Sequence, residues 1–463
     1  MATDLISRDP DAWKNHIVWA GPHRQYSIEQ PAVETHRDRV EPWLSALLQA
    51  EHLNLLVGSG LPAAIAKSAE VPAADMSLAP LDSDFADAVN EAARTAAQNS
   101  GRDKANIEYQ IRSAAELIGG LKILARAAEL GRGGRRLPKS AKRLLAAWEQ
   151  ELDRILVNLL KQILATERHI AEVMADKDEE DRADRTRRLI AGFLLPFASR
   201  AVTRDRLHVF TTNYDRLIEY GCDLLGLRML DRFVGNLAPV FRSSRLGVDF
   251  HYSPPGIQGE PHFLEGVVRF TKLHGSLDWR SVLGPSGSPE VQRCALPFGA
   301  PDDHPGIPTD ARERLLIYPN PAKDVETLEY PYAELFRDLA AAACRPNSVL
   351  VTYGYGFGDD HINRVLRDML SLPSTHLVII SYDDAGDRLR RFYATTGREE
   401  QITLLVGSHF GDLSTLVDAY LPQPAIDRTT WRMAELLSRR GAATGNGEGA
   451  AMDDGIRDDS DSV

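Results

Sequence analysis

The stretch HVFTTNYD, residues 208–215, decides how the rest of the chain is interpreted. Its β-branched and aromatic half predicts a buried strand from Leu207 to Thr211. The Asn and Asp that follow predict a polar turn into a helix from Asp215 to Leu225. In an open α/β sheet, ligands bind at the carboxyl ends of the strands, where this turn would lie. Asp215 could instead only cap the next helix, and the sequence leaves both roles open.

Three further stretches share the pattern of an apolar strand that ends in a polar or glycine-rich turn. They are LNLLVGSG at residues 53–60, FTKLHGSLDW at residues 270–279 and VLVTYGYGFGD at residues 349–359. A glycine turn at the start of a helix leaves backbone N–H groups free to meet phosphate oxygens, and the fixed φ of Pro62 suits such a helix start. A tight turn that only needs positive φ is the alternative for each glycine turn. Together, the four stretches predict a ligand site built from several strand ends.

Strands and helices alternate in the last third of the chain. We expect strands at Ser348–Tyr353, His376–Ser381 and Ile402–Val406, and helices at Tyr332–Cys344, Asp359–Leu370, Asp384–Thr395 and Gly411–Tyr420. Strands separated by single helices imply a parallel, doubly wound sheet. The predicted fold class is therefore α/β, with a Rossmann-like sheet and an inserted helical module.

Residues 76–199 interrupt this alternation with helical patterns. Apolar residues such as Trp148, Ile155 and Leu159 recur at helical spacing, which indicates a helix that buries one face in a core. The predicted division is a lead-in over 1–49, a Rossmann-like domain over 50–75 and 200–425, a helical insertion over 76–199 and a disordered tail over 441–463. Residues 230–265 and 284–310 are predicted to be rich in loops. The basic, glycine-rich loop at 131–139 is either a solvated linker or a docking site for a protein or nucleic acid.

The composition is that of an ordinary soluble globular protein, with 43% apolar and 26% charged residues. The formal net charge of −12 argues against nucleic-acid binding by the surface as a whole, while a local basic patch stays possible. No apolar run approaches the roughly 20 residues that span a bilayer, and the first residues lack a signal-peptide pattern. We therefore expect a cytoplasmic protein without membrane contact.

The three cysteines, Cys222, Cys294 and Cys344, are far apart in the sequence and none belongs to a Cys-x-x-Cys pair. A structural zinc site needs about four Cys or His ligands, usually in close pairs. No zinc or other metal site is predicted.

The four strand-end stretches, in this order, resemble the sirtuin (silent-information-regulator-like) family. In that family a Gly-Ala-Gly-type loop, a Thr-Gln-Asn-Ile-Asp motif, a His-Gly pair and a late glycine-rich strand end hold NAD. The resemblance is to the divergent bacterial branch, whose versions are closer to Thr-Thr-Asn-Tyr-Asp, Lys-Leu-His-Gly-Ser and Gly-Tyr-Gly-Phe. It covers about residues 50–70 and 205–420 and leaves the helical insertion unmatched. Deacylating sirtuins usually carry a four-Cys zinc ribbon after the His-Gly pair, so the unpaired cysteines of this chain count against a deacylase.

The resemblance implies a catalytic role for three residues. Asn213 would bind the nicotinamide ribose and orient the attacking water, His274 would act as the base, and Asp215 would help to hold the nicotinamide amide. The residues implied to bind NAD are Gly58, Ser59, Gly60, Thr212, Tyr214, Gly354, Gly356, Phe357 and Ser381. For an isolated His before Gly, a hydrogen-bonded turn residue is the alternative, and Asp359 is expected to be a helix N-cap only.

A nicotinamide redox enzyme is disfavoured because the turn GSGLPA at residues 58–63 lacks the third glycine of the dinucleotide fingerprint. The resemblance instead implies an NAD⁺ glycohydrolase, which cleaves NAD⁺ to nicotinamide and ADP-ribose, acting as an anti-phage effector that depletes NAD⁺. Only about 40 residues follow the helix expected after the last strand of the sheet, Gly411–Tyr420. Sensing of infection would therefore come from homo-oligomerisation or from a partner such as a HerA-like ring ATPase, which is favoured over a short Argonaute. A deacylase or ADP-ribosyltransferase and a non-catalytic NAD or ADP-ribose sensor are the alternatives, and direct nucleic-acid binding stays open.

Overall fold

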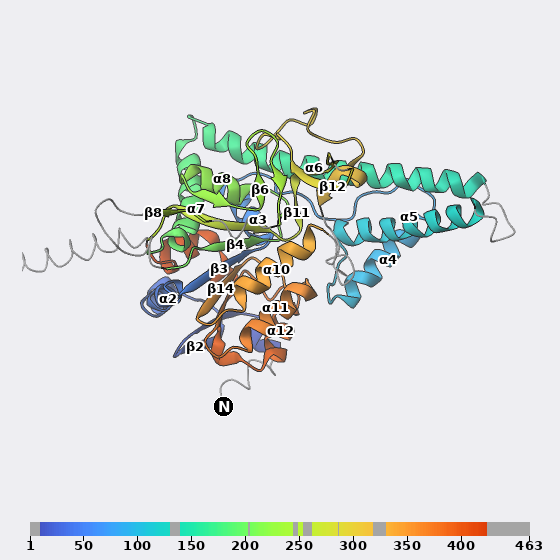
Figure 1. Ribbon diagram of the computed structural model, residues 1–463. Helices are drawn as coiled ribbons and strands as arrows, with labels where there is room; N and C mark the ends of the chain where they lie inside the picture. Colours follow the sequence, from blue (N-terminus) through green and yellow to red (C-terminus); the bar gives the residue numbers. More distant parts are fainter. Residues whose placement is uncertain are drawn as a thin grey trace, which may run out of the picture. The chain divides into compact units, whose positions relative to one another are not determined.

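A nine-stranded sheet forms the centre of the fold in the computed structural model (Figure 1). The structure describes residues 10–129, 139–201, 204–243, 249–252, 262–285, 287–317 and 330–423, and its residues up to Pro422 belong to one compact unit. The strands follow the order β2 (His23–Ile28), β1 (His16–Ala20), β16 (Ile402–Val406), β15 (His376–Ser381), β14 (Ser348–Tyr353), β3 (His52–Val57), β4 (His208–Thr211), β10 (Val267–Lys272) and β5 (Arg228–Leu230).

Most of this sheet is parallel. All neighbouring strands from β16 to β5 pair in parallel, whereas β1 and β2 extend the β16 edge in antiparallel pairing. This arrangement confirms the predicted α/β class with a Rossmann-like sheet. The bounds predicted for β14, β15 and β16 are also correct.

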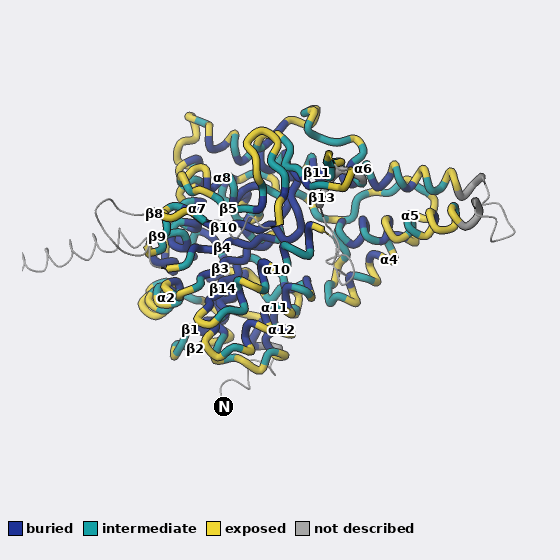
Figure 2. The backbone as a smooth tube through the Cα atoms, viewed as in Figure 1, coloured by how far each residue is buried: buried dark blue, intermediate teal, exposed yellow. Residues whose placement is uncertain are grey.

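Helices cover both faces of the sheet. One face carries α2 (Val33–Leu48), α3 (Gly60–Ser68), α7 (Glu180–Ala198) and α8 (Leu217–Leu224), and the other carries α10 (Tyr332–Ala343), α11 (Asp360–Leu370) and α12 (Arg388–Thr396). Because side chains alternate along a strand, Leu55 and Val57 of β3 enter the first core and Leu56 enters the second. Figure 2 shows the central strands buried, as apolar strands of a parallel sheet require.

The helices that follow β3 and β14 lie on opposite faces of the sheet. Adjacent parallel strands whose connections leave in opposite directions form a topological switch point, and the crevice beyond their carboxyl ends is where α/β sheets bind ligands. The fold therefore places a crevice at the ends of the two glycine-rich stretches.

The helical block consists of α4 (Ala86–Asn99), α5 (Ile107–Glu129) and α6 (Lys139–Ala175), followed by α7. Its core contains the buried side chains of Trp148, Ile155 and Leu159 on α6, as the helical spacing predicted. Helix α7, which the sequence division assigns to the insertion, packs on the sheet with α3 and α8. The domain division as a whole stays a prediction, and the tail at 441–463 and most of the basic loop at 131–139 lie outside the described residues.

Several local predictions were wrong. The chain between β5 and α10 forms a second sheet from β6 (Phe233–Val234), β7 (Val240–Phe241), β11 (Gly275–Leu283), β12 (Pro289–Arg293) and β13 (Leu315–Ile317), and a hairpin from β8 (His251–Tyr252) and β9 (His262–Phe263). Of these strands, β6, β7, β8, β9 and β12 lie in the two stretches where loops were expected. Most of these strands are too short to show an alternating pattern. The helix expected at Gly411–Tyr420 is broken into the segments Ser408–Gly411, Leu413–Thr415 and Leu416–Tyr420, with Asp412 extended between the first two.

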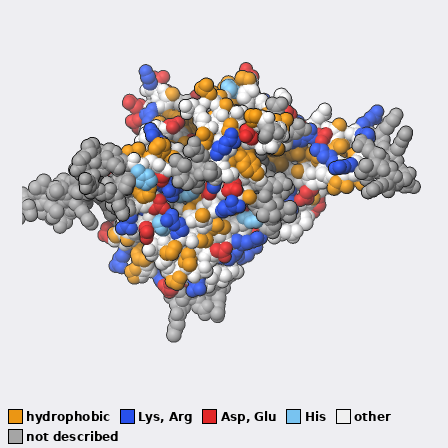
Figure 3. Space-filling model, in the orientation of Figure 1, with side chains coloured by type: hydrophobic (Ala, Val, Ile, Leu, Met, Phe, Trp, Pro, Cys, Tyr) orange, Lys and Arg blue, Asp and Glu red, His pale blue; other side chains and the backbone are white. Residues whose placement is uncertain are grey.

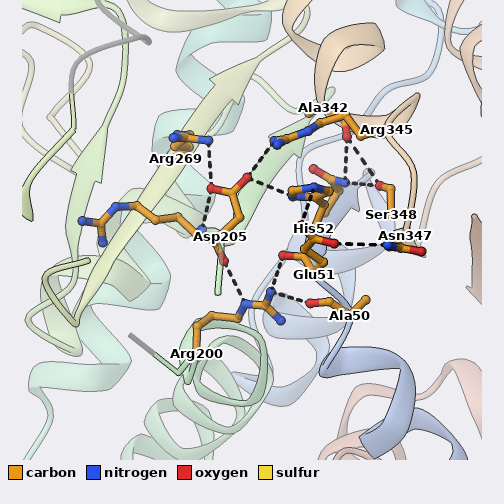
Figure 4. A network of polar contacts seen from close by, with 12 residues as sticks. Ala50, Glu51, His52, Arg200, Asp205, Arg269, Ala342, Arg345, Asn347 and Ser348 are labelled. Atoms are coloured by element: carbon orange, nitrogen blue, oxygen red, sulfur yellow. Dashed lines mark hydrogen bonds and ion pairs between the residues drawn. The ribbon is translucent and has the colours of Figure 1, made fainter. Parts of the chain in front are cut away.

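The amino ends of four strands are joined by the carboxylate of Asp205 (Figure 4). Asp205 precedes β4 and contacts Arg269 of β10 at 3.3 Å, Arg345 before β14 at 2.7 Å and His52 of β3 at 3.1 Å. Arg200 donates to the Asp205 carbonyl at 3.1 Å. Burial would raise the pKa of the Asp205 carboxyl, but Arg269 and Arg345 hold it below its usual value. This network stabilises the end of the sheet that faces away from the crevice.

Acidic and basic side chains are interspersed on the face that Figure 3 shows. Within the described ranges, none of the helices is both long and apolar enough to cross a bilayer.

Candidate active site

A cavity of about 510 Å³ lies at the carboxyl ends of β3, β4 and β14. Its volume is within the range of about 300–1,000 Å³ that is usual for small-molecule and cofactor sites. The cavity is lined by eight of the twelve residues predicted from the sequence, namely Gly58, Ser59, Thr212, Asn213, Tyr214, Asp215, His274 and Gly356. The expected convergence of the four strand-end stretches is therefore observed.

Two glycine turns touch at the switch point. The Gly58 N–H donates to the carbonyl of Tyr353 at 3.0 Å, and the Gly60 N–H donates to that of Gly354 at 3.1 Å. A Cβ on Gly60 would lie 2.5 Å from the Cα of Gly354, and Gly354 itself has φ of +60°. Gly60 and Gly354 are thus required for the close approach of the two turns. Neither of them lines the cavity, whereas Gly58 and Ser59 do.

The side chain of Asn213 is fixed by the end of β3. Val57 provides a carbonyl that accepts from the Thr211 hydroxyl at 3.0 Å, and this hydroxyl accepts from the Asn213 N–H at 3.0 Å. The Asn213 Nδ2 then donates to the carbonyl of Gly58 at 2.9 Å. A polar side chain held by neighbouring backbone groups keeps one geometry, so the Asn213 amide is a pre-oriented group in the cavity wall.

Asp215 forms an Asx-type turn that leads into α8, whose N-cap position is Arg216. Its Oδ1 accepts from the N–H of Leu217 at 3.1 Å, at the start of α8. Its carbonyl accepts from the buried ammonium of Lys272, which also contacts Glu219 at 3.0 Å. Burial raises the pKa of the Asp215 carboxyl, and the charge of Lys272 opposes this shift. Asp215 thus supports the start of α8 and also lines the cavity.

His274 is held by Asp359. The His274 Nε2 lies 2.9 Å from Asp359 Oδ2, and both side chains are buried. The other oxygen, Oδ1, accepts from the N–H groups of His361 at 3.0 Å and Ile362 at 3.4 Å, which caps α11. Because a carboxylate only accepts hydrogen bonds, the imidazole proton lies on Nε2 and the lone pair of neutral His274 lies on Nδ1. The expectation that Asp359 is a helix cap only was therefore wrong.

The helical block contributes to the cavity wall. Glu108 of α5 accepts from the Tyr214 hydroxyl at 2.9 Å and from Asn106 Nδ2 at 3.2 Å. Glu167 of α6 forms a buried ion pair with Arg216 at 2.5 Å. Burial raises the pKa of the Tyr214 hydroxyl, and the nearby Glu108 raises it further. Two helices far from the four stretches in sequence thus hold the turn that carries Asn213.

Two arginines also line the cavity. Arg102 lies between α4 and α5, and Arg388 begins α12. Arg388 Nε donates to the carbonyl of Gly356 at 2.6 Å. Arg102 lies against Gly358, because a Cβ added to this glycine would be 2.9 Å from Arg102 Nη2. The site therefore contains two cationic groups beside the glycine-rich turn after β14.

Two further predicted residues do not line the cavity. Phe357 is buried in the core against Phe392 and Tyr355, with ring centroids 4.9 and 4.8 Å away. The Ser381 hydroxyl donates to the carbonyl of Asp383 at 2.7 Å. The geometry gives both residues structural contacts, and their role in ligand binding stays a prediction without support.

Sequence reasoning missed Arg102, Glu108, Glu167 and Arg388, and it underrated Asp359. The first three lie in the helical block, where no strand-end pattern marks a site. Asp359 offered a signal, because an acidic residue directly follows the glycine-rich stretch that we had singled out.

No cluster of three or more His, Cys, Asp or Glu side chains that could hold a metal ion occurs in the part of the chain that the structure describes. All three cysteines are free thiols. Burial raises the pKa of Cys222 to about 12 and also raises the pKa of Cys294 and Cys344. The thiolate is the reactive form, so these cysteines are poor nucleophiles at neutral pH.

The fold and the site together define an α/β protein with a nucleotide-type crevice at its switch point. The family model described as "SIR2-like domain" matches residues 207–402. This match supports a sirtuin-like family, whose domains are NAD-dependent enzymes. It includes Asn213, His274 and Asp359 but not β3 with its glycine turn, nor the helical block. No curated protein matches the chain.

Proposed function

We propose that the protein is an NAD⁺ glycohydrolase, which cleaves NAD⁺ into nicotinamide and ADP-ribose. The observation that carries this proposal is the convergence of Asn213 and the His274–Asp359 pair on the cavity beside the Gly58-Ser59 turn. A likeness to NAD-dependent enzymes over residues 207–402 supports NAD⁺ as the substrate.

The reaction breaks the bond between C1′ of the ribose and the nicotinamide nitrogen. Departure of nicotinamide builds positive charge on the sugar, so the site has to hold the ribose and supply a nucleophile. We assign Asn213 to hold the ribose and the attacking water, because the contact with Gly58 fixes its amide. His274 removes a proton from the water or a ribose hydroxyl through Nδ1, and Asp359 stabilises the imidazolium that results. Water delivers its hydroxyl group to C1′, which yields ADP-ribose.

The wider role that we propose is depletion of NAD⁺ as an anti-phage effector in the bacterial cytoplasm. It rests on the likeness of the four strand-end stretches to the bacterial branch of the family. We propose a homo-oligomer that acts with a partner such as a HerA-like ATPase. Co-purification of the chain with the product of a neighbouring gene, followed by the same assay, tests this part.

The activity is tested by measuring nicotinamide and ADP-ribose release from NAD⁺ by the purified protein, alone and with the neighbouring gene product. Acetylated-lysine peptide is titrated into parallel reactions. We expect release without peptide, with free ADP-ribose equal to nicotinamide. Release that requires peptide and yields O-acetyl-ADP-ribose would establish a deacylase instead. Tight NAD⁺ binding without any release would favour a sensor.

Asn213→Ala and His274→Ala test the site in this assay. We expect each variant to lose release, because each lacks one group that the reaction needs. Matched controls are Asn158→Ala on the exposed surface of α6 and His304→Ala in the loop before α9 (Ala311–Arg314), since neither residue lines the cavity.

A further inference from the structure

Arg102 and Arg388, which are half-buried, differ in their partners from the buried Arg206 and Arg216. Arg206 and Arg216 form ion pairs of 2.5 Å with Asp249 and Glu167, respectively. Among the residues that the structure describes, neither Arg102 nor Arg388 has a carboxylate partner, although both line the cavity. Two guanidinium groups in the cavity wall thus lack an ion-paired carboxylate among the described residues.

The contacts of the two side chains leave most of their donors unused. Arg388 donates through Nε to the Gly356 carbonyl at 2.6 Å. The buried Nε of Arg102 has no hydrogen-bond partner in the described part of the chain, and its guanidinium lies 5.5 Å from the ring centroid of Tyr109. A buried N–H group without a hydrogen-bond partner lowers the stability of the fold. Binding of a ligand that accepts a hydrogen bond from this group is therefore favoured.

The two cations also act on each other. Burial lowers the pKa of Arg388, and the positive charge of Arg102 lowers it further. The carboxylates of the same wall are already engaged, since Asp359 bonds to His274, Glu108 to Tyr214 and Glu167 to Arg216. A bound anion is therefore the group that would neutralise this end of the cavity.

We propose that Arg102 and Arg388 form a clamp for the diphosphate of the dinucleotide substrate. Guanidinium groups match phosphate oxygens in charge and geometry, because their N–H donors lie in one plane. A Cβ on Gly356 would lie 3.4 Å from Arg388 Nη2, and a Cβ on Gly358 would lie 2.9 Å from Arg102 Nη2, so these glycines allow both guanidinium groups to lie against the turn. The clamp rests on the proposed function, and it makes the helical block part of the substrate site, since Arg102 comes from that block.

The clamp is tested with substrates that share one N-glycosidic bond but differ in phosphate content. NAD⁺ has a diphosphate, nicotinamide mononucleotide has one phosphate and nicotinamide riboside has none. We expect Arg102→Gln and Arg388→Gln each to lower kcat/KM for NAD⁺ by about tenfold to a hundredfold, mainly through KM, because each removes charge-assisted hydrogen bonds. Cleavage of the riboside should stay within about twofold. Equal losses on all three substrates, or no loss on NAD⁺, would overturn the proposal.

Arg94→Gln on α4 and Arg390→Gln on α12 are matched controls, since these arginines pair with Glu91 and Asp387 away from the cavity. Both should bind and cleave NAD⁺ like the unaltered protein.

Calorimetric titration with ADP-ribose and adenosine separates this proposal from the proposed function. We expect the unaltered protein to bind ADP-ribose. Arg102→Gln and Arg388→Gln should each weaken the affinity for ADP-ribose about tenfold or more and leave the affinity for adenosine unchanged. If the unaltered protein cleaves nothing but shows this pattern, the hydrolase assignment fails and the clamp stands. If ADP-ribose does not bind, or binds all variants equally, the clamp is wrong.

Discussion

At the amino end of the central sheet, Asp205 is surrounded by Arg269, Arg345 and His52, whereas at the carboxyl end His274 and its partners border an open cavity. Both ends gather charged side chains from several strands. At the amino end the charges neutralise one another, which ties four strands together. At the carboxyl end, several polar side chains are held in place by the protein and can still form hydrogen bonds to a ligand in the cavity.

The pKa shifts of Asp205 and Asp215 show the same difference between the two ends of the sheet. Arg269 and Arg345 outweigh burial at Asp205 and lower the pKa of its carboxyl, so ionisation of this group stabilises the fold. At Asp215 burial outweighs Lys272 and raises the pKa, so ionisation costs stability. The charged carboxylate is therefore favoured at the amino end of the sheet and disfavoured at Asp215 in the cavity wall. The variants below separate the two ends.

The largest effect on stability is expected for Asp205→Ala. This change leaves Arg269, Arg345 and His52 without their shared carboxylate. The free energy of unfolding should fall by roughly 3 kcal/mol, which is the lower end of the range for a broken buried ion pair. The lower end applies because the partner side chains are partly exposed. Urea denaturation measures the change. Asp302→Ala, which removes an exposed pair with Arg168, should cost about 0–1 kcal/mol. A comparable loss in both variants would show that the amino-end network has no special role.

Asp359→Asn should separate capping from catalysis at the carboxyl end. Asn caps helices as well as Asp, so the free energy of unfolding should change by less than about 1 kcal/mol. Nicotinamide release should fall by up to about 10⁴-fold, because a neutral amide neither fixes the tautomer of His274 nor stabilises its imidazolium. Asp412→Asn is the control, since Asp412 caps the helical segment Leu413–Thr415 outside the cavity by accepting from the Thr415 N–H. Unchanged release by Asp359→Asn would reduce Asp359 to its capping role.

The two aspartates should respond to pH in opposite ways. The folded pKa of Asp215 is raised, so its contribution to stability falls as pH rises above the unfolded value near 3.9. Asp215→Asn should therefore stabilise the protein at pH 7, on the order of 1 kcal/mol, and have little effect at pH 3.

The folded pKa of Asp205 is lowered, so its contribution is present above about pH 4 and is lost as pH falls. Asp205→Asn should destabilise at pH 7 and much less at pH 3. Denaturation curves of both variants at pH 3, 5 and 7 test these signs, and the same direction at all three values for both would refute the contrast.

The smallest effect is expected for Tyr214→Phe, which removes the hydrogen bond between the carboxyl end and α5. Glu108 keeps its contact with Asn106, so the loss of unfolding free energy should be about 1 kcal/mol. Tyr220→Phe is the control, because the Tyr220 hydroxyl makes no hydrogen bond to the described residues. Thermal midpoints of the two variants, compared with the unaltered protein, measure the difference, and equal midpoints would mean that this link does not stabilise the fold.

The sequence predicted the centre of the sheet well because strands β3, β4, β10 and β14 are apolar runs with clear polar ends. Such local patterns also located Asn213 and His274. The sequence analysis missed β2, which is a polar edge strand without an alternating pattern, and it also missed β1, which is a short apolar run of five residues. Short edge strands depend on their neighbours more than on their own residues.

The rest of the site depends on tertiary packing. Arg102 and Glu108 reach the cavity only because the helical block folds back onto the strand ends, which no local pattern records. The core packing of Phe357 could not be predicted, because a Phe in a glycine-rich stretch has the same local sequence whether it packs in the core or faces a ligand. The close contact between Gly60 and Gly354 likewise joins residues far apart in the chain.

The most direct test of the central claim measures nicotinamide release from NAD⁺ for His274→Ala and Asp205→Ala beside the unaltered protein, without peptide and per folded molecule. We predict that His274→Ala loses about 10²- to 10⁴-fold in rate, the usual contribution of a general base, while its unfolding free energy changes little. Asp205→Ala should keep its rate per folded molecule. A folded His274→Ala variant that releases nicotinamide within threefold of the unaltered protein would contradict the account.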